Sequence, residues 1–182
     1  MRPVQAVLKV ADDSPLDSNY WLAGFIDADG SFQIRQKGGR GGRDPVKRRV
    51  ELRFTLEEQK FHKRTGESFE PLLSKIASFL QVNLNTSRHN LREYWSIEST
   101  ATGKLQRLVN YLERYPLLTS KYNSYQLWLE AFYLMRERLH LTERGLSEIL
   151  YIKKNIKSKQ SLSLWNYLCP GVAHRGCATG DG

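Results

Sequence analysis

The stretch from Trp21 to Phe32 constrains this chain most, because its periodicity changes from helical to extended at a single glycine. Leu22, Phe25 and Ile26 have the i, i+3, i+4 spacing of a helix that buries one face. Gly30 is expected to end that helix in the left-handed conformation of a C-cap glycine. The sequence therefore predicts a short helix followed directly by a strand.

Two carboxylates lie in the last turn of the predicted helix. The helix dipole is negative there, so Asp27 and Asp29 are each disfavoured by roughly 0.3 to 1 kcal/mol. A hard cation such as Mg²⁺, which prefers oxygen ligands, would compensate for both charges. The alternative is an ordinary core helix that ends in two solvated acids.

The charge balance of the chain indicates a polyanionic partner. The 182 residues carry a formal net charge of +9, with an isoelectric point of about 9.6, which favours nucleic acid over a small acidic ligand. No apolar run reaches the roughly 18 residues that span a bilayer, so neither a membrane partner nor secretion is expected. Cys169 and Cys177 fit neither a zinc site nor a disulfide framework, which favours a reduced compartment.

After Gly30 the apolar residues recur with period two, and a second alternating run covers residues 50–56. This pattern predicts a β-hairpin with one polar face, which is either a solvated sheet edge or a ribbon for the major groove of B-DNA. The candidates for base contacts on that face are Gln33, Arg35, Lys37, Arg49, Arg53 and Thr55. The loop candidates for phosphate contacts are Arg40, Arg43, Lys47 and Arg48.

The same succession then repeats along the chain. A helical stripe covers residues 69–80, and two alternating runs follow at 82–87 and 93–98 around a turn at 88–92. Further helical stripes appear at 105–112, at 119–132 and after a Thr142 cap. The order predicts an α+β fold, in which a curved antiparallel four-stranded sheet is backed by helices. On the second hairpin, the candidates for DNA contact are Asn83, Asn85, Arg88 and Arg92.

The chain is expected to divide into a lead-in at residues 1–18, one domain at 19–160 and a tail at 161–182. The tail lacks any hydrophobic period, and its last part is expected to be disordered.

The nonapeptide from Leu22 to Gly30 reads LAGFIDADG, and it resembles the signature of the LAGLIDADG homing endonucleases and intron maturases at every position except Phe25. The resemblance covers residues 14–159, including the segment from Tyr115 to Tyr122, and it implies the αββαββα fold of that family. In the family the motif helix packs against the same helix of a second copy. The residues that correspond to this interface here are Leu22, Gly24, Phe25 and Ala28. Because the nonapeptide occurs once, the chain is either a homodimer subunit or one half of a two-motif protein.

The resemblance also implies a catalytic centre with Mg²⁺ or Mn²⁺. By position in the motif, Asp29 would bind the metal, and the Ala28 carbonyl would be a further contact. Lys121 would lie beside the scissile phosphate. A polar residue past the second strand would position water, and spacing favours Glu58 for this role whereas residue type favours Gln59.

The leading interpretation is a sequence-specific DNA endonuclease of intron homing, which makes a metal-dependent staggered double-strand break. The alternative is an RNA-binding maturase that assists splicing without cutting DNA, and a transcriptional regulator on the same scaffold is a weaker third option. An organellar origin, mitochondrion or chloroplast, is expected.

Overall fold

A computed structural model describes residues 14–37 and 49–156, and these form an α+β domain with the predicted order of helices and strands. Residues 1–13 of the lead-in, the basic loop 38–48 and residues 157–182, which include the whole predicted tail, lie outside the described residues. None of the described helices is long and apolar enough to cross a membrane. The elements are α1 Trp21–Asp29, β1 Gly30–Lys37, β2 Arg49–Gln59, α2 Glu70–Leu80, β3 Leu84–His89, β4 Arg92–Ser99, α3 Thr102–Arg114, α4 Lys121–Arg136, η2 Leu139–Leu141 and α5 Glu143–Asn155.

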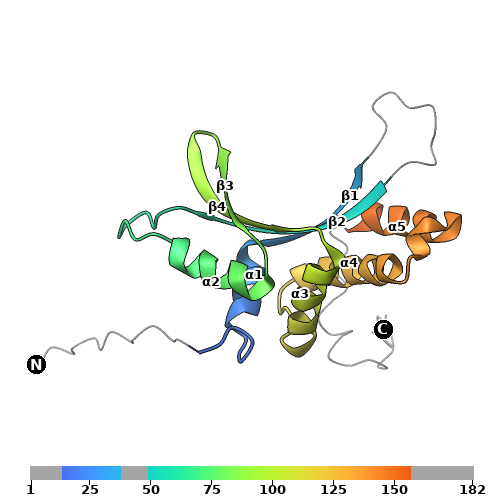
Figure 1. Cartoon of the computed structure of the whole chain (residues 1–182), viewed down its shortest axis with the longest axis horizontal. Helices are drawn as coiled ribbons and strands as arrows, with labels where there is room; N and C mark the ends of the chain where they lie inside the picture. The colour runs from blue at the N-terminus through green and yellow to red at the C-terminus, as the bar shows by residue number, and fades with distance from the viewer. Residues whose placement is uncertain (1–13, 38–48, 157–182) are drawn as a thin grey trace, which may run out of the picture.

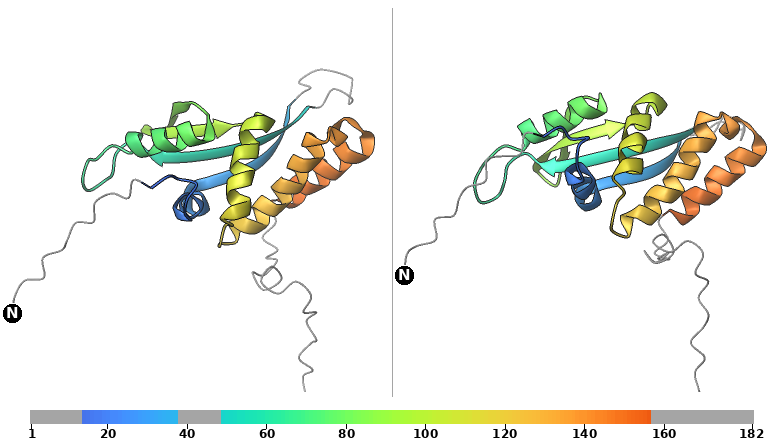
Figure 2. Two further views of the ribbon diagram at one scale, coloured as in Figure 1. Left: turned by 60° about the horizontal axis from the view of Figure 1, so that its bottom comes forward. Right: turned by 90° about the horizontal axis from the view of Figure 1, so that it is seen from below.

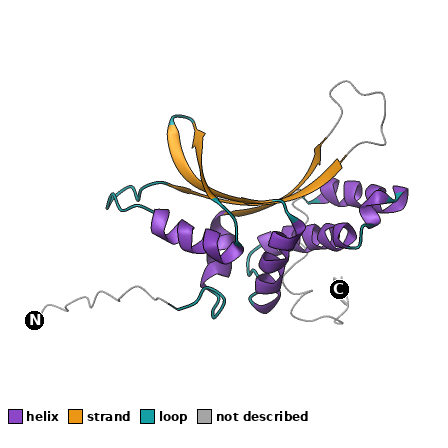
Figure 3. Cartoon of the chain, viewed as in Figure 1, coloured by secondary structure: helices purple, strands orange, loops and turns teal. Residues whose placement is uncertain are grey.

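The four strands form one antiparallel sheet in the order β1-β2-β4-β3. The sheet is strongly curved, and the helices all lie against its convex side (Figure 1). Figure 3 shows the two layers separately, with the concave side of the strands free of helices. We call this concave side the open face. Gly30 pairs with Leu56, so α1 ends beside the late part of β2.

The core lies between the sheet and the helices, as the strand periodicity predicts. Phe32 and Phe54 point to the helix side and are 7 % and 0 % exposed. The centroid of the Phe32 ring lies 5.2 Å from the ring centroid of Tyr125 and 5.4 Å from that of Trp128, and both of these residues are on α4. The leucines predicted for the inner side of α3 are likewise buried. Because apolar residues recur every second position in the strands, the remaining side chains fall on the open face.

Gly30 does not adopt the expected left-handed conformation. Its φ of −70° and ψ of 151° are extended, so α1 passes straight into β1 at this residue. A Cβ there would lie 2.7 Å from the carbonyl oxygen and 2.8 Å from the Cγ2 atom of Ile26. The glycine is therefore required for close packing against the preceding turn and not for its φ angle.

The second hairpin has a tighter turn than predicted. The strands continue to His89 and resume at Arg92, which leaves only Asn90 and Leu91 between them. Both turn residues have positive φ, of 46° and 67°. An asparagine tolerates this region, whereas a leucine there is unusual, so sequence alone favours a longer turn.

Candidate functional site

The two acids at the end of α1 have different environments. Asp27 receives three hydrogen bonds from the segment before α4: its Oδ2 accepts from the backbone N–H of Leu118 at 2.7 Å and of Thr119 at 3.1 Å, and its Oδ1 accepts from the Thr119 hydroxyl at 2.6 Å. The expectation that a metal cation compensates for both acids is thus wrong for Asp27, whose carboxylate is already occupied by these hydrogen bonds. Asp29 is exposed and accepts no hydrogen bond from the described residues. It is the carboxylate of this pair that is available to a ligand.

Lys121 explains how the end of α1 tolerates these acids. Its Nζ donates to the carbonyl oxygens of Ile26 at 3.0 Å and of Ala28 at 3.1 Å. A cation at a helix C-terminus is favourable, so a lysine that opposes the dipole of α4 complements the dipole of α1. Burial lowers the pKa of the Lys121 ammonium, and the nearby carboxylates of Asp27 and Asp29 oppose that shift.

The described residues fit half of a divalent-metal site. No group of three or more His, Cys, Asp or Glu in the described ranges lies close enough to hold a metal ion. Asp29 offers one free carboxylate, while the Ala28 carbonyl already accepts the hydrogen bond from Lys121. Mg²⁺ is commonly held by one or two carboxylates together with phosphate oxygens and water. A second carboxylate from another helix would therefore complete such a site.

The outer side of α1 is apolar and partly exposed. The rings of Trp21 and Phe25 stack at 5.4 Å, and Trp21 is 46 % exposed. A Cβ added to Gly24 would meet no atom of the described residues within 4 Å beyond its chain neighbours and the nearby backbone of its own helix, and Ala28 is exposed as well. Leu22 is 0 % exposed, so its assignment to an interface between motif helices is wrong. The helical period turns this side chain into the core of its own domain.

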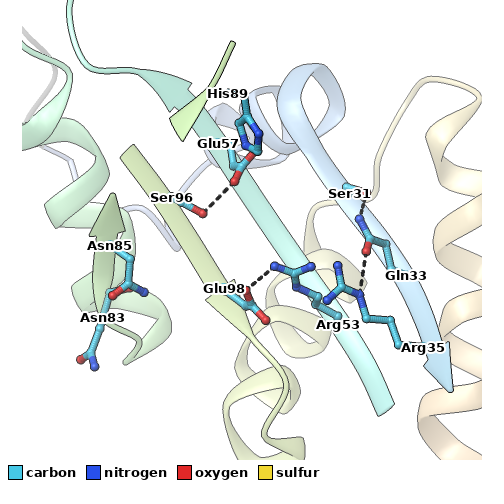
Figure 4. Close-up of polar contacts among 10 residues, drawn as sticks. All are labelled: Ser31, Gln33, Arg35, Arg53, Glu57, Asn83, Asn85, His89, Ser96 and Glu98. Atoms are coloured by element: carbon cyan, nitrogen blue, oxygen red, sulfur yellow. Dashed lines mark hydrogen bonds and ion pairs between the residues drawn. The ribbon is translucent and has the colours of Figure 1, made fainter. Parts of the chain in front are cut away.

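The open face of β1 carries a chain of polar side chains. The Gln33 amide nitrogen donates to the Ser31 hydroxyl at 3.1 Å, and the Arg35 Nε donates to the Gln33 amide oxygen at 3.3 Å (Figure 4). Gln33 is half-buried, whereas Arg35 is exposed. The side chains of Lys37 and Arg49 lie outside the described part, as do Arg40, Arg43, Lys47 and Arg48. Their roles remain predictions.

In the middle of the open face, ion pairs hold the polar side chains. Arg53 forms a salt bridge with Glu98, and its side chain is 16 % exposed. Glu57 accepts a hydrogen bond from the Ser96 hydroxyl at 3.1 Å (Figure 4). The second carboxylate oxygen of Glu57 lies 3.4 Å from His89 Nε2. The centre of the open face therefore carries a preassembled network of paired side chains rather than isolated cations.

Sequence reasoning missed the acids of this network. Glu98 lies opposite Thr55 in the register of β2 and β4, so the alternation of β4 could have placed it on the open face. Thr55 lies on that face, but it is only 8 % exposed and offers little contact surface.

The candidates on the second hairpin divide between the two faces. Asn85 lies opposite Ser96 and Arg92 lies opposite His89, which places both on the open face. Asn83 precedes β3, is exposed, and accepts a hydrogen bond through its carbonyl from the Asn85 amide at 3.5 Å. Arg88 lies opposite Glu93 and has the opposite parity, so it does not lie on the open face, and its contact with DNA stays a prediction.

Glu58 and Gln59, the candidates for positioning water, lie at the end of β2. Glu58 Oε1 accepts from the backbone N–H of Gln59 at 2.8 Å. Both residues line a hollow of about 430 Å³ with the following loop, whereas Lys121 lines a different one beside β1. Within one chain, the structure does not bring these candidates and Lys121 into one pocket. Their catalytic role stays a prediction.

The helix that ends in Asp29, the saddle-shaped sheet and the sequence all point to one family. Residues 22–132 match the profile of the LAGLIDADG endonuclease family, and the chain belongs to that family. An uncharacterized cox1 intron-2 protein of 37.2 kDa from Schizosaccharomyces pombe is 39 % identical over 132 residues, which are 72 % of this chain and 36 % of that protein. A probable intron-encoded DNA endonuclease, aI1, from Mycosarcoma maydis is 36 % identical over 121 residues, which are 65 % of this chain and 98 % of that protein.

A solved structure shows the same fold. The meganuclease I-SmaMI, bound to uncleaveable DNA, superposes with a TM-score of 0.63 and 25 % identity over 77 % of this chain and 44 % of its own. The present chain thus spans about a third of the Schizosaccharomyces pombe relative and less than half of I-SmaMI, but nearly all of the Mycosarcoma maydis relative.

Proposed function

We propose that this chain is one half of a divalent-metal-dependent DNA endonuclease that acts in intron homing. The observation that carries the proposal is the free carboxylate of Asp29, at the end of a helix whose outer side is exposed and apolar. The names of the Mycosarcoma maydis relative, an intron-encoded DNA endonuclease, and of DNA-bound I-SmaMI support it. The relative named for a cox1 intron supports the organellar origin.

In this proposal two motif helices pair through the side that carries Trp21, Gly24, Phe25 and Ala28. Pairing brings Asp29 together with its counterpart, and the two carboxylates hold Mg²⁺ or Mn²⁺. The metal would activate water and stabilise the leaving oxygen of the phosphodiester. The second helix belongs to another copy of this chain or to a separate LAGLIDADG half.

Lys121 and Asp27 have distinct tasks around that centre. An ammonium group has three N–H donors, and Lys121 uses two of them on the carbonyls of α1. The third can donate to a phosphate oxygen as charge develops there. Asp27 holds the backbone before α4, so it positions Lys121 through that segment.

The open face supplies the DNA-binding surface. Gln33 and Arg35 on β1, the Arg53–Glu98 pair and the second hairpin present donors and acceptors of the kinds that read base edges in the major groove. The net charge of +9 provides the long-range attraction to the duplex.

The proposal is tested by selecting cleaved sites from a randomised duplex library with Mg²⁺, beside a Ca²⁺ control. Wild-type protein should cut both strands and leave staggered ends. Asp29→Asn should abolish cutting but keep DNA binding, because it removes the ligand charge and preserves shape. Asp17→Asn, which removes an exposed acid ahead of α1, is the matched control and should cut normally.

Full cleavage by a clean Asp29→Asn preparation would eliminate the proposed centre. Tight binding of structured intron RNA without any cleaved DNA product would instead indicate the maturase alternative.

A further inference from the structure

A groove of about 660 Å³ follows the outer edge of β1. Its walls are the consecutive residues 30–35 of β1, the start of α4 and the end of α5. Both helices contact this strand, and Figure 2 shows them beside it in two views. We call this feature the β1 groove. Residues 30–35 span five intervals at the rise of a β-strand, so the groove is about 17 Å long.

The β1 groove is cationic. Arg35, Lys121 and Lys153 line it, and none of the described residues in its wall is acidic. Two hydroxyl side chains, Ser31 and Ser124, add further hydrogen-bonding groups. The composition suits an extended anion with several oxygen acceptors.

The position of the groove connects it to the rest of the candidate site. It begins at Gly30, directly after Asp29, and Lys121 contributes both to the groove and to the end of α1. Its wall also includes Ser31, Gln33 and Arg35, so the groove opens toward the face proposed to carry DNA.

We propose that the β1 groove binds the phosphodiester backbone of the DNA strand next to the cut, and that Lys153 contacts a phosphate there. This inference rests on the proposed function. It adds the end of α5, which is not part of the open face, to the surface that contacts DNA.

If Lys153 only stabilises α5, the expected effect of replacing it differs from that of a phosphate contact. Lys153 and Lys154 both lie in the last turn of α5, where cations complement the helix dipole. Only Lys153 lines the groove and is half-buried, whereas Lys154 is exposed. If the dipole accounts for both lysines, replacing either one should have the same effect. Lys154 is therefore the matched control.

The test compares wild-type protein with Lys153→Ala, Lys154→Ala and Lys153→Arg. Binding to a random-sequence DNA duplex is measured by fluorescence anisotropy over a salt series, with EDTA present so that no strand is cut. Lys153→Ala should weaken binding and reduce the slope of log K against log salt by about one, as the loss of one phosphate contact does. Lys154→Ala should leave the slope unchanged, and Lys153→Arg should restore it. Thermal unfolding of each variant reports any loss of helix stability separately.

Equal slopes for Lys153→Ala and Lys154→Ala would overturn the groove assignment while leaving the proposed function intact. A wild-type protein that binds no duplex would overturn both. The assignment would also be contradicted if Lys153→Arg kept the reduced salt slope of Lys153→Ala. An arginine at position 153 carries the same charge and should contact the same phosphate.

Discussion

At the scale of single residues, Tyr111 shows how a side chain on α3 fixes the start of α1. Its hydroxyl accepts from the backbone N–H of Ala23 at 2.9 Å and donates to the carbonyl of Asn19 at 2.9 Å. Burial raises the pKa of this hydroxyl, so it stays neutral and can perform both roles. The N-terminal N–H groups of a helix have no partner within the helix, and Tyr111 supplies one from 88 residues away.

Replacing Tyr111 with phenylalanine should therefore destabilise the domain by about 1 to 3 kcal/mol, because it leaves the buried N–H of Ala23 without a partner. Chemical denaturation monitored by fluorescence measures this change. Tyr151→Phe, on a side chain that is 70 % exposed, is the control and should change stability very little. Equal stabilities for the two variants would show that the Tyr111 hydroxyl is unimportant.

At the scale of elements, β2 and β4 assemble the centre of the open face. The Arg53–Glu98 pair joins these strands across the register Thr55↔Glu98. Because Glu98 holds the guanidinium, the orientation of Arg53 depends on a strand that lies 45 residues further along the chain.

This dependence predicts coupling between Arg53 and Glu98 in DNA recognition. Arg53→Ala should relax base preference at one position of the target by about 1 to 3 kcal/mol. Glu98→Ala should reduce preference at the same position, and the double variant should lose no more than Arg53→Ala alone. Competition binding with duplexes varied at single positions gives these values.

Glu57→Ala provides the comparison for this cycle, because Glu57 contacts Ser96 and His89 instead of Arg53. Its effect should appear at another position and should add to that of Arg53→Ala. Additive losses for Arg53 and Glu98 would mean that the two residues act separately.

At the scale of the whole molecule, one domain exposes an apolar helix side next to a single free carboxylate. Trp21 on that side is 46 % exposed, and Leu118, whose backbone N–H donates to Asp27 at the other end of α1, is 68 % exposed. Gly24 on the same side has open space around it, whereas the position of Gly30 is closely packed. The domain alone therefore leaves an apolar surface exposed and the proposed metal site incomplete, which is why we propose a partner.

Gly24→Leu should prevent association without unfolding the domain, because position 24 has open space next to its Cβ site, whereas a larger side chain there would separate two paired helices. Sedimentation should show monomers at concentrations where the wild-type protein dimerises, with thermal unfolding of the domain preserved. Gly103→Leu, at another helical glycine with open space around it, is the matched control and should dimerise normally. Dimers of Gly24→Leu would place the interface elsewhere, and a monomeric wild type would indicate a separate second half as the partner.

The sequence by itself determined the elements, the sheet with one apolar and one polar face, and the identity of the motif helix. These features depend on spacings of two to four residues, which set the face of a helix or strand on which each side chain lies. The tertiary structure decided the roles of single residues within that frame. Asp27 and Asp29 are two residues apart in the same motif, yet only the approach of Leu118 and Thr119 makes the first structural and leaves the second free. Likewise, the contact of Lys121 with α1 and the pairing of Arg53 with Glu98 join segments that are 93 and 45 residues apart. Contacts of this kind arise where segments that are distant in the sequence pack together in the fold, and no local period in the sequence encodes them.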